Sequence, residues 1–298
     1  MSLGGELTRA FDLRPKRSWR GVKSNLMTVL MAAAVGLIAI PLVLVMVSVF
    51  SKGGAILFHD FPSFLTADIP PVRKAGPGMG PAVIGTLIIT GTATLIAVPL
   101  GVLGAIFLNE YGGASKFARL VRFMAMVMTG VPSIVMGLFI YVVWTMHFHL
   151  QAFGGALALA CLMLPIVINA SEQMLRLVPN SLREASFALG ATKARTVLTV
   201  VLPAAGSGIV SGSLLAVARA AGETAPLLFT IGAARTINTA LFTDENTALS
   251  ARIFENAKEA VVNAQDRGWG AALALVLLAF SLTVIARVVT AYATKVRK

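Results

Sequence analysis

Stretches without a charged residue constrain the fold of this chain more than any other feature of its sequence. They cover residues 24–51, 75–109, 123–171, 196–218 and 268–286, and the longest has 49 residues. A helix needs about 20 apolar residues to cross a bilayer, so the longest stretch has room for two such helices. A polar patch at residues 147–151 separates those two.

The stretches together predict six membrane-spanning helices, and hence an all-α polytopic membrane protein. Their expected bounds are residues 26–50, 82–108, 123–146, 155–175, 204–222 and 269–290. The composition agrees with this prediction, because 57% of the residues are hydrophobic and only 13% are charged. Soluble domains carry about 25% charged residues.

The distribution of basic residues predicts that both termini lie on the cytoplasmic side of the inner membrane. With the N-terminus inside, 17 lysines and arginines fall on the cytoplasmic side and seven on the outside. Only Arg219 lies within a span. This is the asymmetry of the positive-inside rule, so the net charge of +12 reflects topology. Because the basic residues form no face interleaved with aromatic residues, nucleic-acid binding is excluded.

Missing motifs exclude several further function classes. The sequence has no Gly-x-x-x-x-Gly-Lys-Ser/Thr loop, so it cannot bind ATP through a P-loop. Cys161 is the single cysteine, which excludes an intrachain disulfide. His147 and His149 have no Cys, Asp or Glu beside them, so a metal site is not expected there. No catalytic residue, metal or cofactor is predicted in this chain.

The cytoplasmic segment 177–203 interrupts the apolar pattern with a predicted helix–turn–helix. Pro179 ends the preceding span, and Ser181 with Glu184 three residues later predicts a capping box at the start of a new helix. Gly190 provides the turn that leaves this helix. One side of the helix carries the small residues Ala185, Ser186 and Ala188. Two interpretations stay open: a solvated loop with a capped helix, or a surface that another protein approaches closely.

Glycine and proline interrupt two of the predicted spans. Residues 130–133 (Gly-Val-Pro-Ser) and Gly137 lie in the third span, and Pro165 lies in the fourth. Proline removes a backbone hydrogen bond and bends a helix, which membranes tolerate where neighbours or water replace that bond. The bends are either part of a pathway or ordinary kinks for close helix packing.

Three charged side chains are candidates for a transport pathway. Arg219 and Glu223 are four residues apart and therefore share one helix face, and Glu172 lies near the inner end of the fourth span. The planar fork of an arginine suits the oxygens of an oxyanion. The alternative is structural pairing, in which Arg219 neutralises Glu223 and Glu172 pairs with Arg176 one turn later.

The cytoplasmic segment resembles the EAA motif of ABC-importer permease subunits. The matching residues are Glu184, Ala185, Ser186, Gly190, Leu202 and Pro203, with Ser186 in place of the usual alanine. In that family the segment is a coupling helix that seats in a groove of the ATPase subunit. Residues 109–112, 131–135, 177–184 and 218–228 are further similar to the PstA family, one of the two permeases of the phosphate importer. The chain departs from some members at Asn169, where they carry an arginine.

The resemblance implies a type I ABC importer permease fold that carries inorganic phosphate. It implies a division into a basic cytoplasmic tail (1–25), a first helix with its external loop (26–80), a permease domain (81–291) and a short cytoplasmic tail (292–298). The coupling segment, residues 179–203, lies between the fourth and fifth spans. Such a permease is not an enzyme, because ATP and Mg²⁺ bind to a partner subunit.

The resemblance also implies the partners. They are a second, PstC-like permease as heterodimer partner, two copies of a PstB-like ATPase and an extracytoplasmic PstS-like phosphate-binding protein. The external segment 223–268 is a candidate docking surface for the binding protein, or a lid over the second permease.

Two alternative functions stay open. The first is a sulfate or molybdate ABC permease, but Phe-Gly-Ala typically follows the glutamate there, whereas Thr224-Ala225-Pro226 follows Glu223 here. The second is a stand-alone channel or an ion-coupled transporter, which the cytoplasmic coupling segment argues against.

Overall fold

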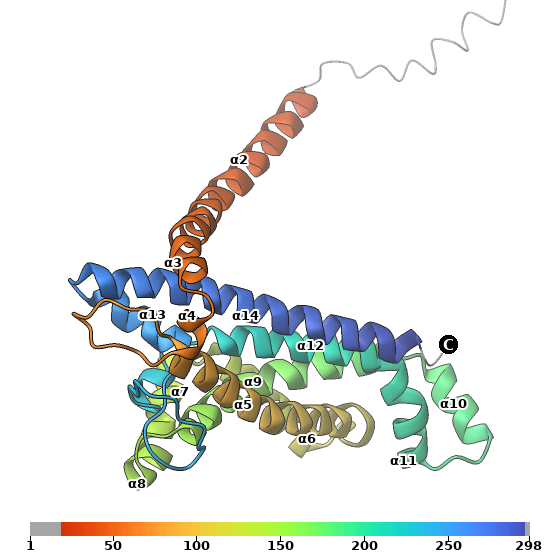
Figure 1. The fold of residues 1–298 in the computed structure, drawn as a ribbon. Coiled ribbons are helices and arrows are strands. Elements are labelled where there is room, and N and C mark those ends of the chain that lie inside the picture. Colours follow the sequence, from red (N-terminus) through yellow and green to blue (C-terminus); the bar gives the residue numbers. More distant parts are fainter. Residues whose placement is uncertain (1–18, 296–298) are drawn as a thin grey trace, which may run out of the picture. The chain divides into compact units, whose positions relative to one another are not determined.

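The computed structural model describes residues 19–295, and all regular elements in this range are helical (Figure 1). The basic residues Arg9, Arg14, Lys16, Arg17, Arg297 and Lys298 of the topology prediction lie outside the described residues. The chain forms two compact units, residues 1–50 and residues 51–298.

The first unit contains one long helix, α2 (Trp19–Ser48), with Pro41 inside it. None of its residues is buried, and apolar side chains such as Leu37 and Ile38 are about three-quarters exposed, at 73% and 74%. A helix that exposes apolar side chains all round needs an apolar solvent, as a bilayer provides. This helix corresponds to the first predicted span.

The second unit has a core of three long helices. These are α5 (Gly80–Ile106), α9 (Ala152–Arg176) and α12 (Leu202–Ala221), with α14 (Val262–Lys295) packed against α12. Small residues allow close packing, since a Cβ added at Gly101 of α5 would lie 2.7 Å from Cγ1 of Val167. The buried core residues from these helices include Ile89, Ala93, Leu159, Met163 and Ala216.

Short elements fill the segment that the sequence predicts as an external loop. A π-helix, η1 (Val49–Gly53), is followed by α3 (Gly54–His59) and α4 (Ser63–Thr66). The sixth span is also longer than its predicted bounds of 269–290, so the expected C-terminal tail is helical up to Lys295.

The third predicted span is broken rather than continuous. Helix α6 (Lys116–Gly130) is followed by α7 (Ser133–Ile140), η3 (Tyr141–Thr145) and α8 (Met146–Phe148), and the chain bends by 107° at the break. Pro132 causes the break, because a residue before proline avoids helical torsion angles and Val131 is extended, with ψ of 127°. Within the described residues, five helices are long and apolar enough to cross a membrane, or six if the bent pair forms one span.

Residues 177–203, the segment predicted to be cytoplasmic, form the predicted helical hairpin. Helix α10 (Asn180–Ala188) is followed by α11 (Lys193–Thr196) and a π-helical turn, η4 (Val197–Val201), that runs into α12. The predicted capping box is wrong, because α10 begins at Asn180 after Pro179 and no side chain caps it. Pro179 has a fixed φ of −60° and starts the helix itself, so Ser181 lies inside the helix.

The external segment between α12 and α14 folds into short elements. The 3-10 helix η5 (Leu227–Phe229) lies next to α7, and α13 (Leu249–Lys258) packs on α14. A turn of π-helix, η2 (Phe107–Tyr111), follows the C-terminal end of α5.

Candidate functional site

A cavity of about 340 Å³ lies beside the break between α6 and α7. Arg219 and Glu223 line it together with residues on both sides of the break and two residues of α9: Met128, Thr129, Val131, Pro132, Ser133, Leu162 and Ile166. The structure therefore brings two features together that the sequence showed separately, the Gly-Val-Pro-Ser interruption and the charged pair. Apolar walls with a few polar groups are typical of a small-molecule site.

Arg219 and Glu223 form the pair that their spacing predicted. Nη2 of Arg219 lies 3.4 Å from Oε1 of Glu223, which makes an ion pair that is longer than an ordinary hydrogen bond. The Arg219 side chain is 67% exposed, whereas that of Glu223 is 17% exposed. A guanidinium is costly in contact with lipid tails, so an exposed arginine in a span is expected to face water or another protein.

Glu172 does not lie in this cavity. Its Oε1 accepts hydrogen bonds from Nε of Arg122, at 2.8 Å, and from Nη2 of Arg176, at 2.7 Å. Arg122 also donates to the carbonyl oxygen of Leu108, at 2.6 Å. Of the two alternatives for Glu172, the geometry supports structural pairing, and Arg122 is a second partner that the sequence did not indicate.

A larger cavity of about 840 Å³ at the end of α8 is less suited to an anion. Asp244 and Glu245 line it, and among its lining residues only His149 could carry a positive charge. Two carboxylates would repel an oxyanion, whereas Arg219 would attract one. Among the described residues, no three His, Cys, Asp or Glu side chains are grouped to hold a metal ion.

The coupling hairpin, residues 179–203, is held together by a buried hydrogen bond between the hydroxyl groups of Ser186 and Thr196, at 2.8 Å. Ser186 therefore faces α11 and is buried, whereas Ala185 and Ala188, the other small residues of this helix, are exposed. Gly190 has φ of +80°, as the predicted turn requires. Glu184 and Ala185 are exposed on α10, and Leu202 and Pro203 begin α12.

Sequence reasoning missed the apolar tip of this hairpin. Leu182, Phe187 and Leu189 are 44%, 45% and 88% exposed. Large apolar side chains that are exposed on a hairpin outside the predicted spans are typical of a protein interface. The signal was available, because these three residues stand in a segment that the topology places outside the membrane.

An arginine organises the external segment. Arg252 of α13 is buried, and it donates to the carbonyl oxygens of Ala233 and Ala234, at 2.5 and 2.6 Å, and to Oγ1 of Thr247, at 2.9 Å. Nη1 donates to Glu255, at 2.8 Å. Burial lowers the pKa of the Arg252 guanidinium, and the Glu255 carboxylate opposes this shift.

Comparisons with known proteins agree with this architecture. Residues 97–298 match the family described as binding-protein-dependent transport system inner membrane component. The phosphate transport system permease protein PstA 1 of Mycobacterium tuberculosis is 38% identical over 288 residues, which cover 96% of this chain and 93% of that protein. The phosphate transport system permease protein PstA of Yersinia pestis is 38% identical over 281 residues, 93% of each chain.

A solved structure shows the same fold at low sequence identity. A bacterial ABC transporter involved in the import of the acidic polysaccharide alginate superposes with a TM-score of 0.62 and 14% identity, covering 93% of this chain and 99% of that chain. At this identity the likeness describes the fold alone. The helical architecture predicted from the apolar stretches is confirmed.

Proposed function

Because this chain belongs to the family of binding-protein-dependent transport system inner membrane components, we propose that it carries inorganic phosphate across the cytoplasmic membrane. It is a permease subunit of an ABC importer and not an enzyme, and a separate subunit hydrolyses ATP. The similarity to phosphate transport permeases over most of the chain supports phosphate as the substrate.

Arg219 beside the cavity is the observation that carries this proposal. Its exposed guanidinium lies at the end of α12, where α6 and α7 break. A planar fork donates two parallel hydrogen bonds to phosphate oxygens, and its positive charge attracts the anion. In this proposal Arg219 and Glu223 lie on the translocation path, and Glu172 stabilises the cytoplasmic ends of the helices around it.

Coupling to the ATPase is assigned to the hairpin. Glu184 and Ala185 form the polar part of the contact, and the apolar tip seats in a groove of the ATPase. Ser186 and Gly190 shape the hairpin, and Leu202 with Pro203 passes its movement into α12. ATP and Mg²⁺ bind to the ATPase in this proposal.

The complete importer that we propose has four kinds of subunit. This chain pairs with a second, PstC-like permease, two copies of a PstB-like ATPase bind inside, and a PstS-like phosphate-binding protein docks outside. The excess of basic residues on one side supports a topology with both termini cytoplasmic.

Competition for uptake tests the substrate. Proteoliposomes with the assembled complex and its binding protein are given labelled phosphate and ATP, with excess unlabelled sulfate, molybdate or phosphate. Only unlabelled phosphate is expected to suppress uptake. Suppression by sulfate or molybdate would instead favour the oxyanion permease of the alternative. Copurification of an ATPase with the tagged chain distinguishes either kind of ABC permease, for phosphate or for another oxyanion, from a stand-alone channel.

A further inference from the structure

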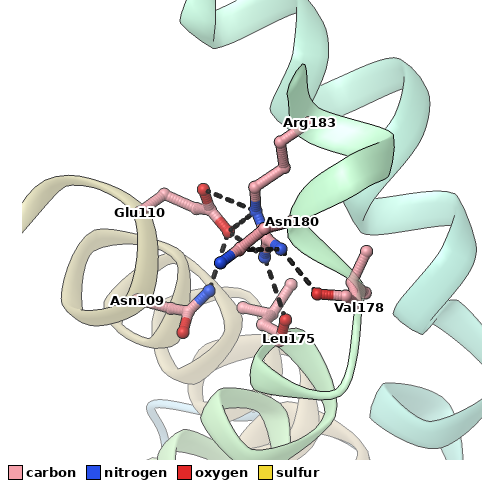
Figure 2. A network of polar contacts seen from close by, with 6 residues as sticks. All are labelled: Asn109, Glu110, Leu175, Val178, Asn180 and Arg183. Carbon is pink, nitrogen blue, oxygen red and sulfur yellow. Dashed lines mark hydrogen bonds and ion pairs between the residues drawn. The ribbon is translucent and has the colours of Figure 1, made fainter. Parts of the chain in front are cut away.

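The cytoplasmic end of span two is bound to the coupling hairpin by a buried ion pair (Figure 2). Nη2 of Arg183, in α10, lies 2.8 Å from Oε1 of Glu110, in η2. Nε of Arg183 also lies 3.3 and 3.4 Å from the two carboxylate oxygens. The side chains of Arg183 and Glu110 are only 14% and 7% exposed. The pair joins residues 73 positions apart in the sequence.

Arg183 makes a second set of contacts with the end of α9. Nη1 donates to the carbonyl oxygen of Val178, at 2.6 Å, and Nη2 donates to that of Leu175, at 3.0 Å. The last carbonyl groups of a helix have no partner within the helix, and a cation there is also favoured by the helix dipole. One guanidinium therefore holds three elements together: η2, the end of α9, and α10.

Neighbouring contacts join η2 to both arms of the hairpin. Asn109 donates to Oε1 of Glu110, at 2.7 Å, and so orients the carboxylate. On the other arm of the hairpin, Nζ of Lys193 lies 5.0 Å from the ring centre of Tyr111. Successive residues of η2, Glu110 and Tyr111, thus contact α10 and α11 respectively.

The hairpin is continuous in sequence with α9 and α12, but not with α5. Its two arms are joined by the hydrogen bond between Ser186 and Thr196, so they move as one piece. A force applied at its tip reaches α9 and α12 through the backbone. It reaches α5 through the packing of α5 on α9 and through direct contacts of η2 with the hairpin, and the Glu110–Arg183 pair is the charge-assisted hydrogen bond among these direct contacts.

We infer that Glu110 and Arg183 are positioning residues for coupling, which make α5 move together with the coupling hairpin when the ATPase binds nucleotide. This inference rests on the proposed function of the hairpin. Without the pair, the hairpin would still reach the ATPase, but its movement would be shared less strictly with span two. Hydrolysis would then continue while transport falls.

Spin-label distances test whether the two elements move together. Labels are placed at Leu103 of α5, which is 62% exposed, and at Ala194 of α11, an exposed hairpin residue outside the apolar tip, in a Cys161→Ala background. The assembled complex is measured without nucleotide and with ATP plus vanadate. We expect the same distance distribution in both states for the wild type. We expect a shifted or broader distribution on nucleotide binding for Glu110→Gln.

A coupling ratio gives the functional readout in the same complexes. For Glu110→Gln we expect the phosphate imported per ATP hydrolysed to fall about tenfold while complex yield stays normal. Arg183→Lys keeps the charge, but a lysine cannot donate to the carboxylate and to both carbonyl groups at once. The phosphate imported per ATP hydrolysed should therefore fall by a similar factor in this variant. The double variant Glu110→Gln, Arg183→Gln should be no worse than the poorer single variant. Arg176→Gln is the matched control, since Glu172 keeps Arg122 as a partner.

The outcomes distinguish this inference from the proposed function. A wild-type distance that already changes between states, or unchanged distances in Glu110→Gln, overturns the inference. Lower yield with a normal coupling ratio overturns it as well, because that pattern indicates a purely structural pair. If the distances behave as expected but wild-type complexes import no phosphate, the substrate proposal fails and the inference stands.

Discussion

The charged side chains in the spans differ in how many partners each one has. Glu172 accepts from two arginines and is 8% exposed at its side chain, so its charge is balanced within this chain. Arg219 has one long contact, to Glu223, and is 67% exposed. A cation with so little compensation is costly unless water, substrate or another subunit completes its surroundings. This difference supports a structural part for Glu172, and it is consistent with the proposed pathway part for Arg219.

Removal of the Arg219 charge should abolish phosphate uptake while the complex persists in the membrane. Arg219→Lys should rescue poorly, because an ammonium keeps the charge but loses the planar fork. The decisive variant is Arg219→Ala, Glu223→Ala, which leaves neither charge unpaired. Uptake and complex yield are measured together, and we expect lost uptake at full yield. Near-normal uptake in the double variant would reject the pathway part and leave a structural ion pair.

Gly190 offers a second test at the residue scale, because a side chain there would strain the backbone without colliding with a neighbouring residue. A Cβ added at Gly190 would meet nothing within 4 Å, but φ is +80°. Gly190→Val should therefore cost about 1 kcal/mol or more through backbone strain alone. Gly190→Asn is the matched control, since asparagine visits this region readily. We expect less copurified ATPase and lower uptake for Val, and equal behaviour of both variants would contradict the argument.

Helices whose two ends carry a sequence signal were predictable from the sequence, whereas elements whose shape depends on contacts with distant segments were not. Helices α9 and α12 lie close to their predicted spans because both ends of each are marked: the polar patch at 147–151 precedes α9, Pro203 lies at the start of α12, and charged residues lie at the end of both. The start of α10 was misplaced because the serine–glutamate spacing outweighed Pro179 in the prediction. Pro132 marked the break after α6 in the sequence, but the size of the bend, 107°, and the cavity beside it were not predictable. The cavity depends on residues of α9 and on Arg219 and Glu223, which come from distant segments.

The candidate site shows the same division. The spacing of Arg219 and Glu223 predicted their pairing, since residues four apart share a helix face. The pairing of Glu110 with Arg183 was not predictable, because it joins segments 73 residues apart. Both residues lie in segments that resemble a known family, residues 109–112 and 177–184, but that resemblance did not indicate that the two side chains contact each other.

Packing of α7 against the external segment can be tested with two glycines of the broken span. A Cβ added at Gly137 would lie 2.5 Å from the Cα of Pro226, whereas one added at Gly130 would meet nothing within 4 Å. Gly137→Val should therefore displace α7 from η5 at a cost of about 1–3 kcal/mol. Gly130→Ala should be neutral. Thermal stability of the purified complex and uptake are the measurements, and equal stability of the two variants would show that α7 has room to shift.

At the scale of the whole molecule, the second unit places a contact surface at each end of its helices. The coupling hairpin lies at one end, where η2, α9 and α10 meet. The external segment lies at the other, where α13 packs on α14 and Arg252 binds the loop before it. Each surface is held by its own arginine, Arg183 at the hairpin and Arg252 at the external segment, and each of them binds backbone carbonyl groups and a carboxylate. The two ends should therefore fail separately when one arginine is removed.

Arg252→Ala should loosen the external segment and leave the hairpin intact. It removes the four hydrogen bonds that Arg252 donates to the carbonyl oxygens of Ala233 and Ala234, to Thr247 and to Glu255. The loss should cost about 3 kcal/mol or more, because these acceptors are left without their donor. Limited proteolysis from the outer side should then cleave the loop before α13 faster. ATPase copurification should be normal, and stimulation of hydrolysis by the binding protein should be lost. Arg235→Ala, at an exposed arginine of the same segment, is the control. Unchanged cleavage and stimulation would mean that α13 keeps its place without Arg252, whereas loss of the ATPase would mean that the two ends are not independent.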